Sequence, residues 1–153
     1  MGYGLPAAIG AKFGCPERNV CVFCGDGGFQ MTEQELGTIM EYNVNIKIVI
    51  LNNNYLGNVK QWQDLFFNSR YSQTPLLNPD FIKLADAYDI KGENVSKREE
   101  LNEAVLRMVN HKGAYILNVN IDPDDTVFPM IYPGSPIDEI MLSPTEKLDI
   151  LNL

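Results

Sequence analysis

Apolar residues follow two alternating patterns along the chain, one typical of buried strands and the other typical of helices. Residues 19–24 and 46–54 each contain a short, continuous apolar run, as expected of strands that are covered on both faces. Shorter runs at 93–95 and 114–121 predict two further strands. Because helical patterns separate these runs, the sequence favours an α/β fold, with an open, mainly parallel sheet and helices on both faces.

The helical segments carry apolar residues every three or four positions, which predicts amphipathic helices. They cover residues 4–14, 32–43, 57–67, 78–88 and 96–111. The last of them has an apolar stripe made of Leu101, Ala104, Val105, Met108 and Val109.

Three of these helices have recognisable start signals. Thr32 with Glu35, and Ser96 with Glu99, have the spacing of capping boxes, in which each residue bonds a free backbone N–H at the helix start. Asn78, which precedes Pro79, is expected to be the N-cap of the helix over 78–88.

The periodic patterns end at residue 121. We therefore expect an α/β domain over residues 1–121, truncated at its N-terminus, and a Pro-rich C-terminal tail over 122–153. A tail with this many apolar side chains is expected to pack across its own domain or a neighbouring one.

Composition restricts the possible partners. The chain has 153 residues and a formal net charge of −8, which argues against nucleic acid or an anionic membrane as the main partner. No apolar segment approaches the ~20 residues that span a bilayer. Three cysteines, an odd number, are typical of a reducing compartment, so the expected location is the cytoplasm.

Cys21 and Cys24 form a C-x-x-C pair, which in other settings binds metal or carries out redox chemistry. Here they lie in a predicted strand, where residues three apart point to opposite faces. A second pair of ligands is also missing, since His111 is the only histidine. Packing in a buried strand is therefore the favoured interpretation of these two thiols.

An acidic residue lies among glycines at the end of the first buried strand. In "GDGG", the glycines of residues 25–28 would let backbone N–H groups approach a phosphate, which the carboxylate of Asp26 would repel. The next buried strand ends in "NNN", residues 52–54, and ligands of open parallel sheets lie beyond the carboxyl ends of the strands. A magnesium ion held by these oxygens would bind the phosphate.

A simpler interpretation exists for each half of this pattern. Asp26 could cap the helix that follows the loop, and the asparagines could simply turn the chain. The presence of both features at the ends of two buried strands favours the metal–phosphate site.

"GDG", followed by 24 residues and "NN", resembles the thiamine-diphosphate-binding motif of thiamine-dependent enzymes. The blocks "GYGLPAAIGAK", "QWQDLFF", "RYSQT", "NPDFIKLA" and "VFPMIYPGSPIDEIM" resemble the C-terminal domain of the acetolactate synthase (acetohydroxyacid synthase) large subunit. Together they cover nearly the whole chain, and only "SPTEKLDILNL" at the end matches nothing in that family.

The resemblance implies a set of cofactor-binding residues. The side chains of Asp26 and Asn53 and the main-chain carbonyl of Tyr55 would bind Mg²⁺. Gly25, Gly27 and Gly28, with the turn at Leu56 and Gly57, would bring backbone N–H groups to the diphosphate.

The resemblance also implies roles around the rings of the cofactor and the substrate. Met1 matches a methionine that lies under the cofactor, although it could equally be an initiator methionine without a role. Val59 and Trp62 match residues of the substrate channel, where the tryptophan helps to select the second 2-keto acid; plain packing beside Phe66 is the alternative.

The family joins two molecules of pyruvate, or pyruvate and 2-oxobutyrate, with loss of CO₂, in branched-chain amino-acid biosynthesis. The resemblance implies thiamine diphosphate and Mg²⁺ here, and FAD on a different domain of the parent enzyme. It further implies as partners the pyrimidine and FAD domains of the large subunit, a second copy of that subunit and a regulatory small subunit.

The glutamate that activates the cofactor in this family lies on the pyrimidine domain, and nothing in the sequence replaces it. Glu33, Glu35 and Glu41 have the spacing of surface charges on a helix. We therefore expect no catalytic residue on this chain and no activity from the chain alone.

Three alternatives are weaker. Another thiamine-dependent decarboxylase, oxidase or carboligase is disfavoured by "QWQDLFF" and "RYSQT". A separate subunit of a split thiamine enzyme is disfavoured by the motif cut off at residue 1. A non-catalytic binding module, or a Rossmann dinucleotide-binding domain, is disfavoured because the sequence has no G-x-G-x-x-G motif.

Overall fold

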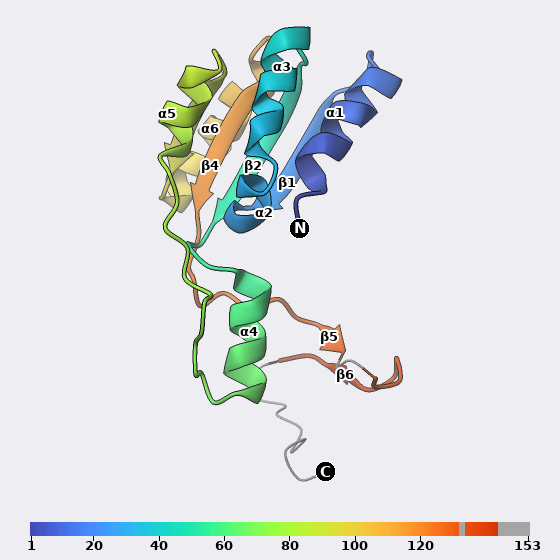
Figure 1. The fold of residues 1–153 in the computed structure, drawn as a ribbon, viewed down its shortest axis with the longest axis vertical. Helices are drawn as coiled ribbons and strands as arrows, with labels where there is room; N and C mark the ends of the chain where they lie inside the picture. The colour runs from blue at the N-terminus through green and yellow to red at the C-terminus, as the bar shows by residue number, and fades with distance from the viewer. Residues whose placement is uncertain (132–133, 144–153) are drawn as a thin grey trace.

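A computed structural model describes residues 1–131 and 134–143 (Figure 1). Its main sheet has four strands, all parallel, in the order β1-β2-β4-β3. The strands are β1 (Val20–Gly25), β2 (Ile46–Asn52), β3 (Lys91–Val95) and β4 (Tyr115–Asn120). The α/β fold with a parallel sheet, expected from the sequence, is confirmed.

Helices cover both faces of this sheet, as expected (Figure 1). One face carries α1 (Gly4–Gly14), α3 (Leu36–Tyr42) and α5 (Phe81–Ala87), with the short α2 (Asp26–Gln30) at the end of β1; the other carries α6 (Arg98–Asn110). The handedness of the crossovers explains this division. The chain moves from β1 to β2 to β3 in one direction across the sheet and returns from β3 to β4, so a right-handed connection places α6 on the opposite face.

The core is built on the two central strands. Ile46, Ile48 and Ile50 of β2 are fully buried under α1, α3 and α5, while Val49 and Leu117 face α6. Each such side chain contributes roughly 1.5–3 kcal/mol by leaving water. β2 is therefore covered on both faces, as its apolar run predicted.

The expectation for β1 was wrong on one face. β1 is an edge strand, and α6 lies over β3 and β4, so that Phe23 is 68% exposed and Cys21 is exposed too. Cys15 is also exposed, and Cys24 is half-buried. The prediction of buried packing therefore holds for Cys24 only in part and is wrong for Cys21.

Neither predicted capping box forms. Thr32 precedes a single 3₁₀ turn, η1 (Glu33–Glu35), and makes no side-chain cap; the Glu35 carboxylate accepts a hydrogen bond from Thr38 Oγ1 instead. Ser96 accepts a hydrogen bond from Asn120 Nδ2 across the sheet, so that α6 begins after an uncapped Lys97. A tertiary partner therefore replaces the local one at Ser96, whereas at Glu35 the partner is another residue of the same helical segment.

Two further details of the helices differ from expectation. The N-cap of α5 is Asp80, whose carboxylate accepts the N–H groups of Ile82 and Lys83, and not Asn78. On α6, Val105 and Val109 are 36% and 56% exposed, because only the side that carries Ala104 and Met108 meets the sheet.

α4 (Gly57–Phe66) lies beyond the carboxyl ends of the strands, apart from the other helices (Figure 1). The chain that leaves β4 runs beside it and reaches a small antiparallel pair, β5 (Met130–Ile131) and β6 (Ile140–Met141). The last part of the predicted C-terminal tail, from residue 144 onward, lies outside the described residues. No helix in the described ranges is long and apolar enough to cross a bilayer.

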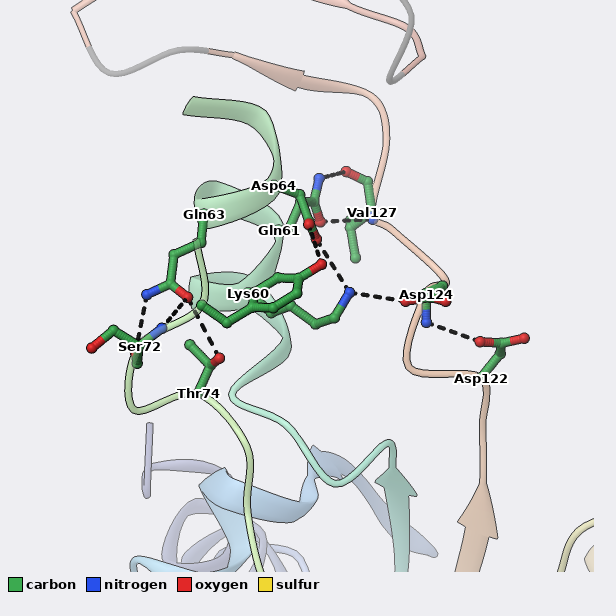
Figure 2. Close-up of polar contacts among 10 residues, drawn as sticks. Lys60, Gln61, Gln63, Asp64, Ser72, Thr74, Asp122, Asp124 and Val127 are labelled. Atoms are coloured by element: carbon green, nitrogen blue, oxygen red, sulfur yellow. Dashed lines mark hydrogen bonds and ion pairs between the residues drawn. The ribbon is translucent and has the colours of Figure 1, made fainter. Parts of the chain in front are cut away.

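A buried lysine joins α4 to this segment (Figure 2). The side chain of Lys60 is 7% exposed, and its ammonium lies 3.2 Å from Asp64 Oδ2 and 3.0 Å from Asp124 Oδ1. Next to it, the amide of Gln61 donates to the carbonyl of Val127 and accepts from its N–H, both at 2.9 Å. These contacts satisfy the polar groups of the tail that face α4.

The ion pairs oppose the cost of burial. Burial alone would lower the pKa of Lys60, but its hydrogen bonds to Asp124 and Asp64 outweigh this and raise the pKa above its ordinary value. Burial would raise the pKa of Asp64, but hydrogen bonds from Tyr71 and Lys60 lower it. The contribution of Asp64 to stability is therefore present above its unfolded pKa, ~3.9, and is lost as the pH falls through the folded value.

We predict that Lys60→Met lowers the free energy of unfolding at pH 7 by about 1–3 kcal/mol, because Asp64 loses a charged partner. The melting temperature should fall by roughly 2–10 °C in a chain of this size. The difference from wild type should begin to shrink as the pH falls below the unfolded pKa of Asp64, ~3.9, and should disappear only below its lowered folded pKa. Thermal unfolding followed by circular dichroism at pH 7 and pH 3.5 measures both effects.

Lys83→Met is the matched control, because it removes a lysine whose ion pair is exposed. The side chain of Lys83 is 85% exposed, and its ammonium lies 3.5 Å from Asp80 Oδ2. It should change the free energy of unfolding by less than about 0.5 kcal/mol at either pH. An equal loss at both pH values for Lys60→Met would assign its effect to packing of the aliphatic stem and contradict the ion-pair account.

Candidate cofactor site

The register of the sheet brings the two predicted loops together. Gly25 of β1 pairs with Leu51 of β2, so that the next residues, Asp26 and Asn52, lie side by side where the strands end. β4 ends beside them, and the N–H of Ile121 bonds the carbonyl of Asn52 at 2.9 Å. The "GDGG" and "NNN" segments therefore occupy one edge of the sheet, as expected of parallel strands.

Asp26 is a buried carboxylate at this edge. It is 1% exposed and is the first residue of α2, whose N-cap is Gly25. Its side chain makes no capping bond, so the simpler interpretation of Asp26 as a helix cap does not hold. Within residues 1–131 and 134–143, its one hydrogen-bond donor is the amide of Asn78, 2.7 Å from Oδ2.

The asparagine segment turns sharply beyond β2. Asn52 Oδ1 accepts the N–H of Asn54 at 3.2 Å, and Asn53 Oδ1 accepts the N–H of Tyr55 at 3.1 Å. Asn54 lies between them with φ of +57°, a left-handed conformation that asparagine tolerates better than most residues. This segment is also tied to the chain that precedes α5, since the N–H of Leu56 bonds the carbonyl of Thr74 at 2.8 Å.

A cavity of about 460 Å³ lies at the ends of β1 and β2. All nine predicted cofactor-binding residues line it: Met1, Gly25, Asp26, Gly27, Gly28, Asn53, Tyr55, Leu56 and Gly57. Phe23, Cys24, Leu51 and Ile121 add an apolar wall. The cavity thus combines one buried acidic residue, amide and main-chain groups, and glycine backbone with an apolar side.

The glycines leave room where side chains would intrude. No atom lies within 4 Å of the position that a Cβ would take on Gly25 or Gly28. A Cβ on Gly27 would be 2.7 Å from Leu56 Cδ2, and one on Gly57 would be 2.9 Å from Asn53 Nδ2. Gly25 and Gly28 therefore leave backbone open to the cavity. Gly27 and Gly57 allow close packing against Leu56 and Asn53.

Cys24 contributes no charge to this cavity. Burial, and to a lesser extent the neighbouring carboxylate of Asp26, raises the pKa of Cys24 to about 11. The thiol therefore stays protonated at neutral pH and does not act as a thiolate ligand or nucleophile. Within the described ranges, no group of three or more His, Cys, Asp or Glu residues could hold a metal ion by itself.

The two predicted channel residues lie at different places on α4. Val59 lines the cavity and is 42% exposed. Trp62 lies outside its lining; the indole Nε1 donates to Asn58 Oδ1 at 3.2 Å, and the ring packs 4.9 Å from that of Phe66. Contact between α4 and the cavity therefore ends at Val59, one helical turn before Trp62.

The donor set suits a hard divalent cation that also binds a ligand. Mg²⁺ prefers oxygen ligands and takes one or two carboxylates together with phosphate oxygens and water. The carboxylate of Asp26, the amide oxygen of Asn53 and the carbonyl of Tyr55 border the same cavity, and the side chain of Tyr55 need not be acidic if its carbonyl is the ligand. The residues present fit such an ion only with additional oxygens from a ligand.

The sequence pattern does not predict the role of two residues at this edge, Asn78 and Gln30. Asn78 contacts the carboxylate of Asp26, and Gln30 of α2 donates to the amide oxygen of Asn78. Asn78 was assigned to the helix start because Pro79 follows it. The signal that could have corrected this is Asp80, an equally good N-cap residue two positions later, which leaves Asn78 available for another role.

Comparisons with known proteins agree with this geometry. Residues 1–119 match the family described as "Thiamine pyrophosphate enzyme, C-terminal TPP binding domain". The chain is 44% identical over 143 residues to acetolactate synthase of Arthrospira platensis, which covers 92% of the chain and 25% of that protein. It is 48% identical over 141 residues to the mitochondrial acetolactate synthase catalytic subunit of Saccharomyces cerevisiae. This match covers 92% of the chain and 20% of that protein.

A solved structure gives the same result. The thiamine diphosphate-dependent 4-hydroxybenzoylformate decarboxylase of Rhodococcus jostii RHA1 superimposes with a TM-score of 0.75 at 26% identity, over 82% of this chain and 24% of that one. The chain spans about a quarter of the length of the curated relatives it matches. With a family match that covers residues 1–119, the chain belongs to the thiamine pyrophosphate enzymes, as a C-terminal TPP-binding domain.

Proposed function

We propose that this chain is the cofactor-binding part of an acetolactate synthase, which joins two 2-keto acids with loss of CO₂. The observation that carries the proposal is the cavity at the ends of β1 and β2, which is lined by a buried acidic residue, Asp26, together with Asn53 and several glycines. The sequence identity to acetolactate synthases, 44% and 48% in the two relatives above, supports this reaction over others of the thiamine enzymes.

In this proposal, Asp26, Asn53 and the carbonyl of Tyr55 hold Mg²⁺, and the ion holds the diphosphate that Asp26 alone would repel. The backbone at Gly25, Gly27 and Gly28, and the turn at Leu56 and Gly57, approach the diphosphate. Met1, which lines the cavity, supports the ring end of the cofactor. Thiamine diphosphate, when bound, supplies the reactive carbon that removes CO₂ from the first 2-keto acid.

The remaining catalytic parts belong to partners in this proposal. Glu33 and Glu35 lie on η1 and Glu41 on α3, and none of them lines the cavity. The activating glutamate therefore comes from a pyrimidine domain, and FAD binds to another domain of the same large subunit. We propose that the chain alone is inactive, and that the enzyme is a cytoplasmic homodimer or larger assembly with a regulatory small subunit.

A second candidate is a thiamine-dependent decarboxylase that acts on a single 2-keto acid. The superposition with the solved Rhodococcus decarboxylase favours it, because that enzyme carries the same fold. The two candidates share the metal and diphosphate residues and differ in whether a second 2-keto acid is accepted at the channel near Val59 and Trp62.

We predict that Mg²⁺ with thiamine diphosphate raises the melting temperature of the full-length protein that contains these residues. At one hundred times the dissociation constant the gain is about 2.7 kcal/mol, or roughly 2 °C in a protein about four times as long as this chain. Asp26→Ala and the isosteric Asp26→Asn should abolish the rise, because Asp26 is the one charged residue among the three proposed metal ligands. Differential scanning calorimetry with and without both ligands makes the measurement.

Asp86→Ala is the matched control, since Asp86 is an exposed carboxylate on α5 away from the cavity. It should retain the full rise in melting temperature. Equal rises in wild type and in both Asp26 variants would refute the metal assignment.

We further predict that Trp62→Leu changes the preference of the full-length enzyme between pyruvate and 2-oxobutyrate as second substrate. A change in the apolar side chains that contact a substrate typically alters the preference between two similar substrates by about tenfold. Competition between the two acids, with both products quantified by chromatography, gives the ratio directly.

Phe66→Leu separates this role from packing, because Phe66 is the aromatic neighbour of Trp62 on the same helix. A product ratio unchanged in both variants, together with equal losses of melting temperature, would assign Trp62 to packing alone.

A further inference from the structure

Asn78 lies at the centre of a polar cluster behind the candidate metal ligand. Its amide nitrogen is 2.7 Å from Asp26 Oδ2, 2.8 Å from Asn52 Oδ1 and 3.1 Å from Asn54 Oδ1. Its amide oxygen accepts a hydrogen bond from Gln30 Nε2. Asn78 thus connects three segments that are far apart in the sequence: the end of β1, the end of β2 and the chain before α5.

The chemistry of the neighbours fixes the orientation of this amide. Asn52 Oδ1 accepts the backbone N–H of Asn54, and a backbone N–H can only donate, so the atom that faces Asn78 is an oxygen. The carboxylate of Asp26 also only accepts when ionised. The group that Asn78 turns towards both must therefore be its NH₂, which leaves its oxygen for Gln30.

Asn78 approaches the carboxylate from outside the cavity. Asp26 and Asn53 line the cavity, whereas Asn52 and Asn78 do not. Asn78 therefore donates to Asp26 Oδ2 from a position outside the cavity lining, so that it restrains the rotation of this side chain without lining the cavity itself. Asn52, held by the same NH₂ group, is the residue before Asn53, so the second candidate ligand is positioned through its neighbour.

We propose that Asn78 is a positioning residue for the metal site: it sets the orientation of Asp26 and the turn that carries Asn53, without contacting the ion itself. This inference rests on the proposed function, in which Asp26 and Asn53 bind Mg²⁺. Hydrogen-bond partners of metal ligands typically change metal affinity by about 10–100-fold when they are removed. A residue of this kind affects the metal dependence far more than the affinity for the organic part of the cofactor.

The test measures metal affinity in the full-length protein that contains these residues. Asn78→Ala removes the donor, and Asn78→Asp keeps the shape but turns the donor into an acceptor beside Asp26. Mg²⁺ is titrated at saturating thiamine diphosphate, with the rise in melting temperature as the signal, and Mn²⁺ binding is followed in parallel by electron paramagnetic resonance. Asn94→Ala is the matched control, because it removes an amide hydrogen bond of 2.8 Å, to Asn118, at the end of β3.

We expect the half-saturating concentrations of Mg²⁺ and Mn²⁺ to increase about 10–100-fold in both Asn78 variants and to stay unchanged in Asn94→Ala. At saturating Mg²⁺, the half-saturating concentration of thiamine diphosphate should return to the wild-type value. Rescue by excess metal identifies a positioning role, which a general loss of folding would not show. If Asn78→Ala does not fold, Asn78→Asp carries the test by the same measurements.

Three outcomes would contradict the inference, and they are distinguishable. If the wild type does not respond to Mg²⁺ and thiamine diphosphate, the proposed function fails and the positioning role fails with it. If Asp26→Ala abolishes the response while both Asn78 variants keep wild-type metal affinity, the positioning role alone is refuted. If the Asn78 variants lose the response at every Mg²⁺ concentration, Asn78 is a structural residue of the edge and not a metal-positioning one.

Discussion

Backbone hydrogen bonds pair Gly25 of β1 with Leu51 of β2, and the whole candidate site depends on this register. Side chains alternate between the two faces of a strand, so a shift by one residue would turn Ile46, Ile48 and Ile50 away from the core under α1, α3 and α5. The cost of exposing these isoleucines therefore holds Asp26 beside Asn52. The hydrophobic core and the polar edge of the sheet are therefore coupled, because burial in the middle of β2 sets the position of the oxygen atoms at its end.

This arrangement is predictable from the sequence because its signals are local and strong. β2 is buried along nearly its full length, and its continuous apolar run made the strand and its end unambiguous. "GDGG" and "NNN" follow directly after their strands, and parallel strands must end at the same edge, so their proximity followed from the fold class. β1 was harder to predict, because an edge strand with one face left open carries the same apolar letters as a buried one.

Polar side chains were predicted less well, because each has several possible partners and the fold selects among them. Ser96, Thr32 and Asn78 all have good capping chemistry, yet two of them bond residues that are distant in sequence, and the third makes no cap. Lys60 of α4 is buried because the tail places Asp124 against it. No local pattern contains this information, since the partners are separated by 24 to 64 residues. Such contacts become visible only once the strands have set the distances between loops.

The position of α4 has a consequence for how the molecule opens. α4 has few contacts with the helices and strands of the sheet, and it is held by polar bonds to the segment after β4 and to the loop around Ser72. A unit that buries little apolar surface can unfold by itself while the sheet remains intact. Backbone amides of α4 should then exchange with solvent by local opening, and those of β2 only by global unfolding. Since Tyr55 to Gly57 lead directly into α4, part of the cavity wall belongs to the less stable unit, and the rigid half that carries Asp26 persists when the other half opens.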